Sequence, residues 1–94
     1  MNNRALLKID VRNHPGVMSH VTGLFSRRAY NMEAIACAPI DETLSRMYIL
    51  VAHDGRLTQI VKQIKKLVDV RSVTVADDAG DTVYERIHRV FDEV

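Results

Sequence analysis

The chain has 94 residues, a formal net charge of +1 at pH 7, 47% hydrophobic residues and 27% charged residues. These values are ordinary for a globular domain, and they indicate no broad charged surface for nucleic acid or anionic membrane. The single cysteine, Cys37, excludes an internal disulfide, and no stretch has the character of a signal peptide or the length of a membrane span. We therefore expect one cytoplasmic domain that binds neither nucleic acid nor membrane.

The first predicted element is a strand over residues 5–12, followed by an amphipathic helix over residues 17–29. In the strand, apolar and charged residues alternate, so one face is expected to lie on a core. In the helix, apolar residues recur at helical spacing, and this stripe must also lie on a sheet. The apolar face of the strand consists of Ala5, Leu7, Ile9 and Val11.

The join between this strand and helix combines several residues with strong backbone preferences. Asn13 favours turns, Pro15 fixes its own φ, and Gly16 has no Cβ, so another group can approach the backbone there. The first amides of the helix, at Val17 and Met18, are expected to lack an intrahelical partner at the positive end of the helix dipole. Such a helix start suits a small anion or carboxylate. The alternative is that Pro-Gly only turns a strand into a helix.

The remaining elements follow from length, periodicity and bounding turn residues. The order is β-α-β-β-α-β, which predicts an α+β, ferredoxin-like fold: an antiparallel four-stranded sheet with both helices on one face. The predicted strands span residues 32–40, 46–52 and 70–75, with a turn at 41–45 and an amphipathic helix at 57–67.

A C-terminal segment lies outside this core pattern. Residues 76–82 are predicted to be a polar hinge, and residues 83–91 resume apolar residues at helical spacing. We therefore divide the chain into a domain at 1–76 and a hinge with an amphipathic helix at 77–94. The apolar stripe of that helix needs a surface to cover.

The residues offer little catalytic chemistry. The chain has four histidines without the spacing of a zinc site, and Cys37 is expected to be a buried small hydrophobe. No nucleophile–base set and no phosphate-binding glycine motif is present. The sequence thus predicts no metal, no cofactor and no enzymatic activity, and it favours a ligand-binding or regulatory module.

Three features together resemble an ACT domain, and more narrowly the small regulatory subunits of acetohydroxyacid synthase. They are the block Asn-His-Pro-Gly-Val-Met at 13–18, the helix end Gly-Leu-Phe-Ser-Arg-Arg-Ala-Tyr-Asn at 23–31, and the four-strand pattern. The resemblance covers roughly residues 5–76 and is closest to the short form of these subunits. It implies a non-catalytic subunit that pairs with itself and regulates a thiamine-diphosphate-dependent catalytic large subunit in branched-chain amino-acid synthesis.

The resemblance also implies where a branched-chain amino acid binds between two ACT domains. Its carboxylate is expected to meet the amides around Gly16, Val17 and Met18, with Asn13 bonding the polar end of the ligand. Valine is the usual effector in the family. The sequence does not decide whether this chain prefers valine, leucine or isoleucine.

From the partner chain, Asn31 and Met32 are expected to close the pocket. Met32 stands where isoleucine is common in the family, which bears on side-chain selection because methionine is more flexible. Structural alternatives remain: Asn13 as a turn former, Asn31 as a left-handed helix stop and Met32 as plain core.

Two other functions remain as alternatives. One is an ACT-type amino-acid sensor that serves a different enzyme. The other is a small ferredoxin-like hydrolase of the acylphosphatase type, which requires an arginine in the first loop, where this chain has Asn-His-Pro-Gly. For the C-terminal helix, we expect docking on the catalytic subunit or on the ACT dimer.

Overall fold

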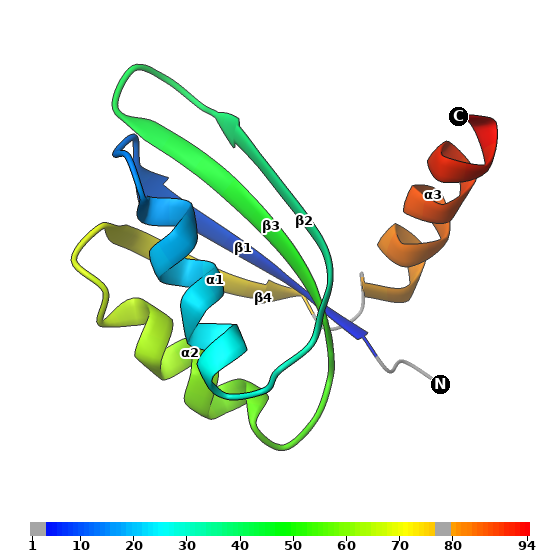
Figure 1. Cartoon of the computed structure of the whole chain (residues 1–94), viewed down its shortest axis with the longest axis horizontal. Helices are drawn as coiled ribbons and strands as arrows, with labels where there is room; N and C mark the ends of the chain where they lie inside the picture. The colour runs from blue at the N-terminus through cyan, green and yellow to red at the C-terminus, as the bar shows by residue number, and fades with distance from the viewer. Residues whose placement is uncertain (1–3, 77–79) are drawn as a thin grey trace.

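The computed structural model describes residues 4–76 and 80–94, and it confirms the predicted ferredoxin-like βαββαβ fold with an additional C-terminal helix (Figure 1). Seven elements follow one another with short connections. They are β1 (Arg4–Arg12), α1 (Val17–Arg27), β2 (Met32–Pro39), β3 (Leu44–Ala52), α2 (Leu57–Lys65), β4 (Val70–Ala76) and α3 (Gly80–Glu93).

The four strands form one antiparallel sheet in the order β2-β3-β1-β4. The central strand β1 places Leu7 opposite Ile49 of β3 and opposite Val75 of β4. Strand β2 therefore lies at one edge and β4 at the other. Helices α1 and α2 lie side by side on one face of this sheet (Figure 1).

The core lies between this face and the two helices. Every second residue of β1 is fully buried, as the alternation in the sequence predicts. Because the side chains of β1 and β3 point to the same face at paired positions, they form a continuous apolar surface for the helices. The largest fully buried side chains include Phe25, Leu7, Ile9, Met47, Ile49, Ile60 and Ile64.

Helix α3 lies over the opposite face of the sheet. Leu6 and Leu50 point away from the main core, and together with Val83 and Ile87 of α3 they line an apolar groove of about 580 Å³. At the start of α3, a Cβ on Gly80 would lie 2.3 Å from the carbonyl oxygen of Arg4. Only glycine permits so close an approach of two backbones.

Several predicted boundaries shift in the structure. Strand β3 begins at Leu44, within the predicted turn, and α1 ends at Arg27 because Ala29 has a left-handed backbone with φ of 52°. The predicted hinge at 76–82 is wrong at its end, since residues 80–82 already belong to α3. Residues 77–79 of that hinge lie outside the described part of the chain.

Cys37 is exposed, so the prediction of a buried side chain is wrong. It lies on β2, where most residues of the outer half are exposed because this edge strand has a neighbour on one side only. The apolar composition of a strand does not distinguish an edge from the middle of a sheet.

The loop between β2 and β3 is held by Asp41. Its Oδ1 atom accepts hydrogen bonds from the backbone amides of Thr43 and Leu44, each at 2.8 Å, and from the Thr43 hydroxyl at 3.0 Å. The backbone amide of Thr43 contributes most to lowering the pKa of the Asp41 carboxyl below its ordinary value of 3.8. This loop supports the β1–α1 junction through the contacts of Asn13 described below.

The close approach at Gly80 yields a stability prediction. Gly80→Ala forces α3 away from β1, and we expect a loss of about 1–3 kcal/mol in the free energy of unfolding, as for overpacked sites. The matched control is Gly55→Ala, because a Cβ on Gly55 meets nothing within 4 Å. Urea denaturation measures both variants, and equal midpoints for the two would contradict the packing of α3 described here.

The carboxylate of Asp41 yields a prediction for pH. Its pKa is lower in the folded chain, so its stabilisation is present above about pH 4 and is lost as pH falls through the lowered value. In Asp41→Asn, the free energy of unfolding should therefore fall less steeply between about pH 5 and about pH 2. Glu42→Gln, at an exposed neighbouring acid, serves as the control. Identical pH profiles for Asp41→Asn and wild type would refute the role of this carboxylate.

Candidate functional site

The junction between β1 and α1 is open at Gly16. This residue has φ of 85° and ψ of −5°, a left-handed conformation that favours glycine, and it stands directly before the first residue of α1. A Cβ on Gly16 would meet nothing within 4 Å, and no side chain caps the start of the helix. The left-handed torsion, not a steric contact, therefore explains why glycine occupies this position. The space beside it is free.

Of the two amides expected to be free at this helix start, only one is. The Val17 amide donates at 3.2 Å to the carbonyl of His14, which precedes the helix, so this amide lacks an intrahelical partner as expected but is not free for a ligand. The tight turn at Pro15 brings that carbonyl back to the helix. Within the part of the chain that the structure describes, the Met18 amide has no hydrogen-bond partner, and its side chain is exposed. An unpaired amide at the positive end of α1 favours an anionic group.

Asn13 connects this junction to the β2–β3 loop. Its backbone amide donates to the carbonyl of Thr43 at 2.8 Å, and its side-chain Nδ2 donates to the carbonyl of Asp41 at 3.1 Å. The hydroxyl of Ser45 donates to Asn13 Oδ1. Asn13 therefore has the structural role kept as an alternative, and a bond to a ligand from this side chain requires exchange of one of these contacts.

The second predicted group, Asn31 and Met32, lies where α1 passes into β2. Asn31 is exposed, whereas Met32 is half-buried and packs against the core, as its structural alternative states. The left-handed helix stop is at Ala29, not at Asn31. Amides of Ala29 and Tyr30 close the helix end by donating to the carbonyls of Ser26 and Phe25 at 3.1 and 2.9 Å.

One chain does not bring the two groups together. They lie at opposite ends of α1, which has 11 residues and is therefore about 16 Å long (Figure 1). The first group is Asn13, Gly16, Val17 and Met18, and the second is Asn31 and Met32. A site that uses both needs a second copy of the chain.

The free edge of β2 is suited to pairing with such a copy. Its sequence, Met-Glu-Ala-Ile-Ala-Cys-Ala-Pro, has one charged residue, and proline only at the end. Ile35, in the middle of the strand, is 43% exposed. Edge strands that do not pair are usually protected by charges, proline or bulges. In β2 these devices are few and lie near the two ends of the strand: Glu33 with the bulge between Met32 and Ala34 at one end, and Pro39 at the other.

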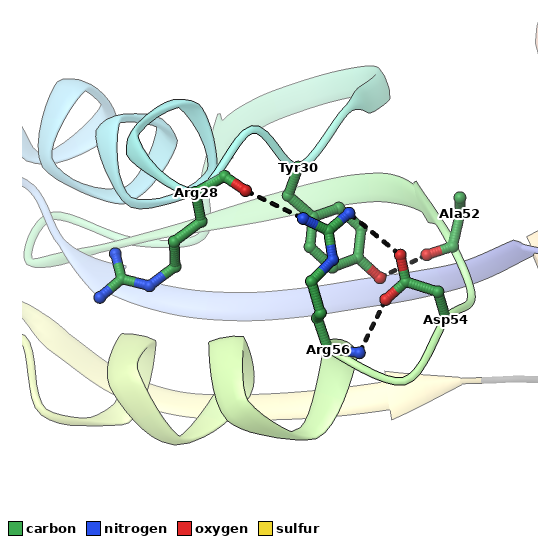
Figure 2. A network of polar contacts seen from close by, with 5 residues as sticks. All are labelled: Arg28, Tyr30, Ala52, Asp54 and Arg56. Carbon is green, nitrogen blue, oxygen red and sulfur yellow. Dashed lines mark hydrogen bonds and ion pairs between the residues drawn. The ribbon is translucent and has the colours of Figure 1, made fainter.

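Sequence reasoning missed a polar network at the end of α1 (Figure 2). Arg56, before α2, donates from its guanidinium to the carbonyl of Arg28 at 3.0 Å and to the carboxylate of Asp54 at 3.2 Å. The guanidinium lies 4.8 Å from the ring centre of Tyr30, whose hydroxyl donates to the carbonyl of Ala52. Tyr30 and Ala52 lie 22 residues apart in the sequence, and Arg28 and Arg56 lie 28 residues apart, so no local pattern indicates these contacts. Only Asp54 is close to Arg56 in the sequence.

The electrostatics of this network follow its geometry. Burial raises the pKa of the Tyr30 hydroxyl, and the amide of Arg56, which donates to Asp54 at 2.7 Å, lowers the pKa of that carboxyl. Tyr30 therefore stays neutral and Asp54 ionised at neutral pH. A neutral donor, an anion and a cation hold the turn together.

No cluster of His, Cys, Asp or Glu that could hold a metal ion occurs within residues 4–76 and 80–94. Over the same residues, none of the helices is both long enough and apolar enough to cross a membrane. The arrangement can thus bind a small anion at α1, but no described group offers metal chemistry there.

Comparison with known proteins identifies the family. Residues 7–72 match the family described as AHAS small subunit-like ACT domain. The chain is 46% identical over 87 residues to the acetolactate synthase isozyme 1 small subunit of Escherichia coli K12, covering 92% of this chain and 90% of that protein. It is 48% identical over 73 residues to the isozyme 3 small subunit of the same organism, covering 76% of this chain and 45% of that protein.

Solved structures agree with this assignment. The acetolactate synthase small subunit of Thermotoga maritima is 40% identical with a TM-score of 0.69, over 77% of this chain and 46% of that one. The regulatory subunit of aspartate kinase from Thermus thermophilus, at 12% identity and a TM-score of 0.70, shares the fold alone, over 83% of this chain and 53% of that one. The chain therefore belongs to the family of acetolactate synthase small subunits, and its core is the ACT domain of that family.

Proposed function

We propose that the chain is a cytoplasmic, non-catalytic regulatory subunit of a thiamine-diphosphate-dependent acetohydroxyacid synthase. Two copies pair and bind a branched-chain amino acid, in the first place valine, at their interface. The subunit activates the catalytic large subunit, and bound valine inhibits it. The family assignment and the match over 90% of the isozyme 1 small subunit support this proposal.

The observation that carries the ligand proposal is the open start of α1. A left-handed Gly16, free space beside it and an unpaired Met18 amide give a carboxylate a place at the positive end of a helix. A free amino acid has such a carboxylate, whereas its ammonium group needs an acceptor elsewhere. The side-chain oxygen of the exposed Asn31 can be that acceptor.

Pairing along β2 supports the shared site. A two-fold axis beside β2 and α1 reverses the direction of the partner helix, since such an interface presents the same surface twice. The start of one α1 then lies near the end of the other, which brings the loop of Gly16 close to Asn31 of the partner subunit. Two equivalent sites result, each using residues of both chains.

The size of the ligand sets the expected energetics. A free amino acid has few atoms, so an affinity in the micromolar-to-millimolar range is expected, about −4 to −8 kcal/mol. Valine then regulates only to the extent that it binds two states of the assembly unequally, typically by about 1–3 kcal/mol. This affinity range suits a sensor of metabolite concentration.

Gly16→Asp tests the carboxylate position. The new side chain places a negative charge where the carboxylate of the ligand is proposed to bind, and we expect loss of valine inhibition in the reconstituted holoenzyme. Gly16→Asn is the matched control, because asparagine has nearly the same shape and tolerates left-handed backbone equally well, without the charge. Retained inhibition in Gly16→Asp would refute the placement, as would equal loss of inhibition in both variants.

The C-terminal helix gives a second test. Val90 and Phe91 on α3 are 56% and 69% exposed, so the helix has apolar surface left to cover. We expect deletion of residues 81–94 to weaken assembly with the thiamine-diphosphate-dependent subunit, as measured by co-purification. Arg89→Gln, at an exposed polar position of the same helix, serves as the control. Unchanged assembly of the deleted chain would count against docking through α3.

A further inference from the structure

The turn that carries Asn31 depends on a residue from another part of the chain. Arg56 contacts three groups at once: the carbonyl of Arg28, the ring of Tyr30 and the carboxylate of Asp54 (Figure 2). From this geometry we infer that Arg56 is a positioning residue for the proposed amino-acid site. It sets the place of Asn31 and thereby the affinity for the effector. This inference rests on the proposed function.

The end of α1 needs such a support. Ala29 has φ of 52°, a left-handed conformation that is strained for a residue with a Cβ, and it stands two positions before Asn31. The carbonyl of Arg28 belongs to the negative end of the helix, where a cation is stabilising. Arg56 supplies that cation by a direct hydrogen bond. Without it, the strained turn loses a charged contact on its outer side.

Tyr30 fixes the other side of the same turn. Its side chain is 3% exposed, its ring meets Phe25 edge-on with ring centres 5.9 Å apart, and its hydroxyl donates to the carbonyl of Ala52 at the end of β3. The guanidinium of Arg56 lies over the outer face of this ring. The backbone leading to Asn31 is therefore held between a buried aromatic ring and a guanidinium.

The chemistry of the guanidinium explains why an arginine is present. Its planar fork donates in two directions while its face lies on an aromatic ring, whereas a lysine ammonium is a point charge that does not stack in this way. Asp54 holds the fork in place, since it accepts from both the side chain and the backbone amide of Arg56. Arg56→Lys therefore keeps the positive charge but loses the simultaneous contacts with the Arg28 carbonyl, Asp54 and the Tyr30 ring.

Arg56 acts on a site shared with the other subunit. Asn31 lies at the end of α1 opposite to Gly16, so in the proposed dimer the network of one chain positions Asn31 against the loop of its partner. Arg56 thus influences binding in trans. If Arg56 served only the folding of its own chain, its substitution would not act selectively on the site that contains Gly16 of the other chain.

The first experiment measures valine binding to the purified dimer by calorimetry. We expect Arg56→Met, which keeps the side-chain stem, to weaken valine binding about tenfold, and Arg56→Lys to be nearly as weak. Arg71→Gln, an exposed arginine on β4 without a described contact, controls for the change in net charge. Wild-type affinity in Arg56→Met would overturn the inference.

The second experiment tests the trans arrangement with mixed dimers purified through two affinity tags. When Gly16→Asp and Arg56→Met are on different chains, one site carries both substitutions and the other carries neither. When both are on one chain and its partner is wild type, each site carries one substitution. We therefore expect one site of wild-type affinity in the first dimer and none in the second.

The outcomes separate this inference from the proposed function. If the wild-type dimer binds no valine, the proposed function fails. If the wild type binds valine and Gly16→Asp abolishes binding, but Arg56→Met binds as the wild type does, only the positioning role fails. The reverse pattern in mixed dimers, with the intact site in the second dimer, would show that Arg56 and Gly16 serve a site within one chain.

Discussion

The left-handed backbone of Gly16 is the constraint on which the rest of this site depends. It lets β1 pass into α1 without a capping side chain, and it leaves the Met18 amide unpaired at the positive end of the helix. Another residue type at this position has to accept strain in the same conformation. A Cβ on Gly16 would meet nothing within 4 Å, so the space beside this turn is open to another group.

The two ends of α1 are braced by different means. At the start, Asn13 and Asp41 connect the junction to the β2–β3 loop through backbone and side-chain hydrogen bonds. At the end, Arg56 and Tyr30 connect the turn to β3 and α2. Because both ends are held within the free chain, little ordering would oppose binding of the small ligand proposed above.

Periodicity in the sequence predicted the seven elements because burial of one face imposes a repeat of two in strands and of 3.6 in helices. The backbone preferences of proline and glycine, not periodicity, predicted the junction at Gly16 between β1 and α1. Two details differ from the sequence-based expectation: Cys37 is exposed, and the Val17 amide is not free for a ligand. The order of strands in a sheet decides which strand is exposed, and a carbonyl three residues away decides whether an amide is free.

Contacts between distant loops could not be predicted from the sequence. Arg56 and the Asp41 carbonyl each meet a partner 28 residues away, and no local pattern encodes such a pair. The family resemblance indicated the same two ends of α1 that the structure separates. Because one chain keeps these two ends apart, a site that uses both groups needs a second copy of the chain, as the resemblance implies.

The most direct test of this account is a crystal structure of the dimer grown in saturating valine. The account predicts the valine carboxylate within hydrogen-bond distance of the Met18 amide beside Gly16, with Asn31 of the partner subunit at the ammonium group. Valine in the apolar groove beneath α3, with the turn at Gly16 empty, would contradict it.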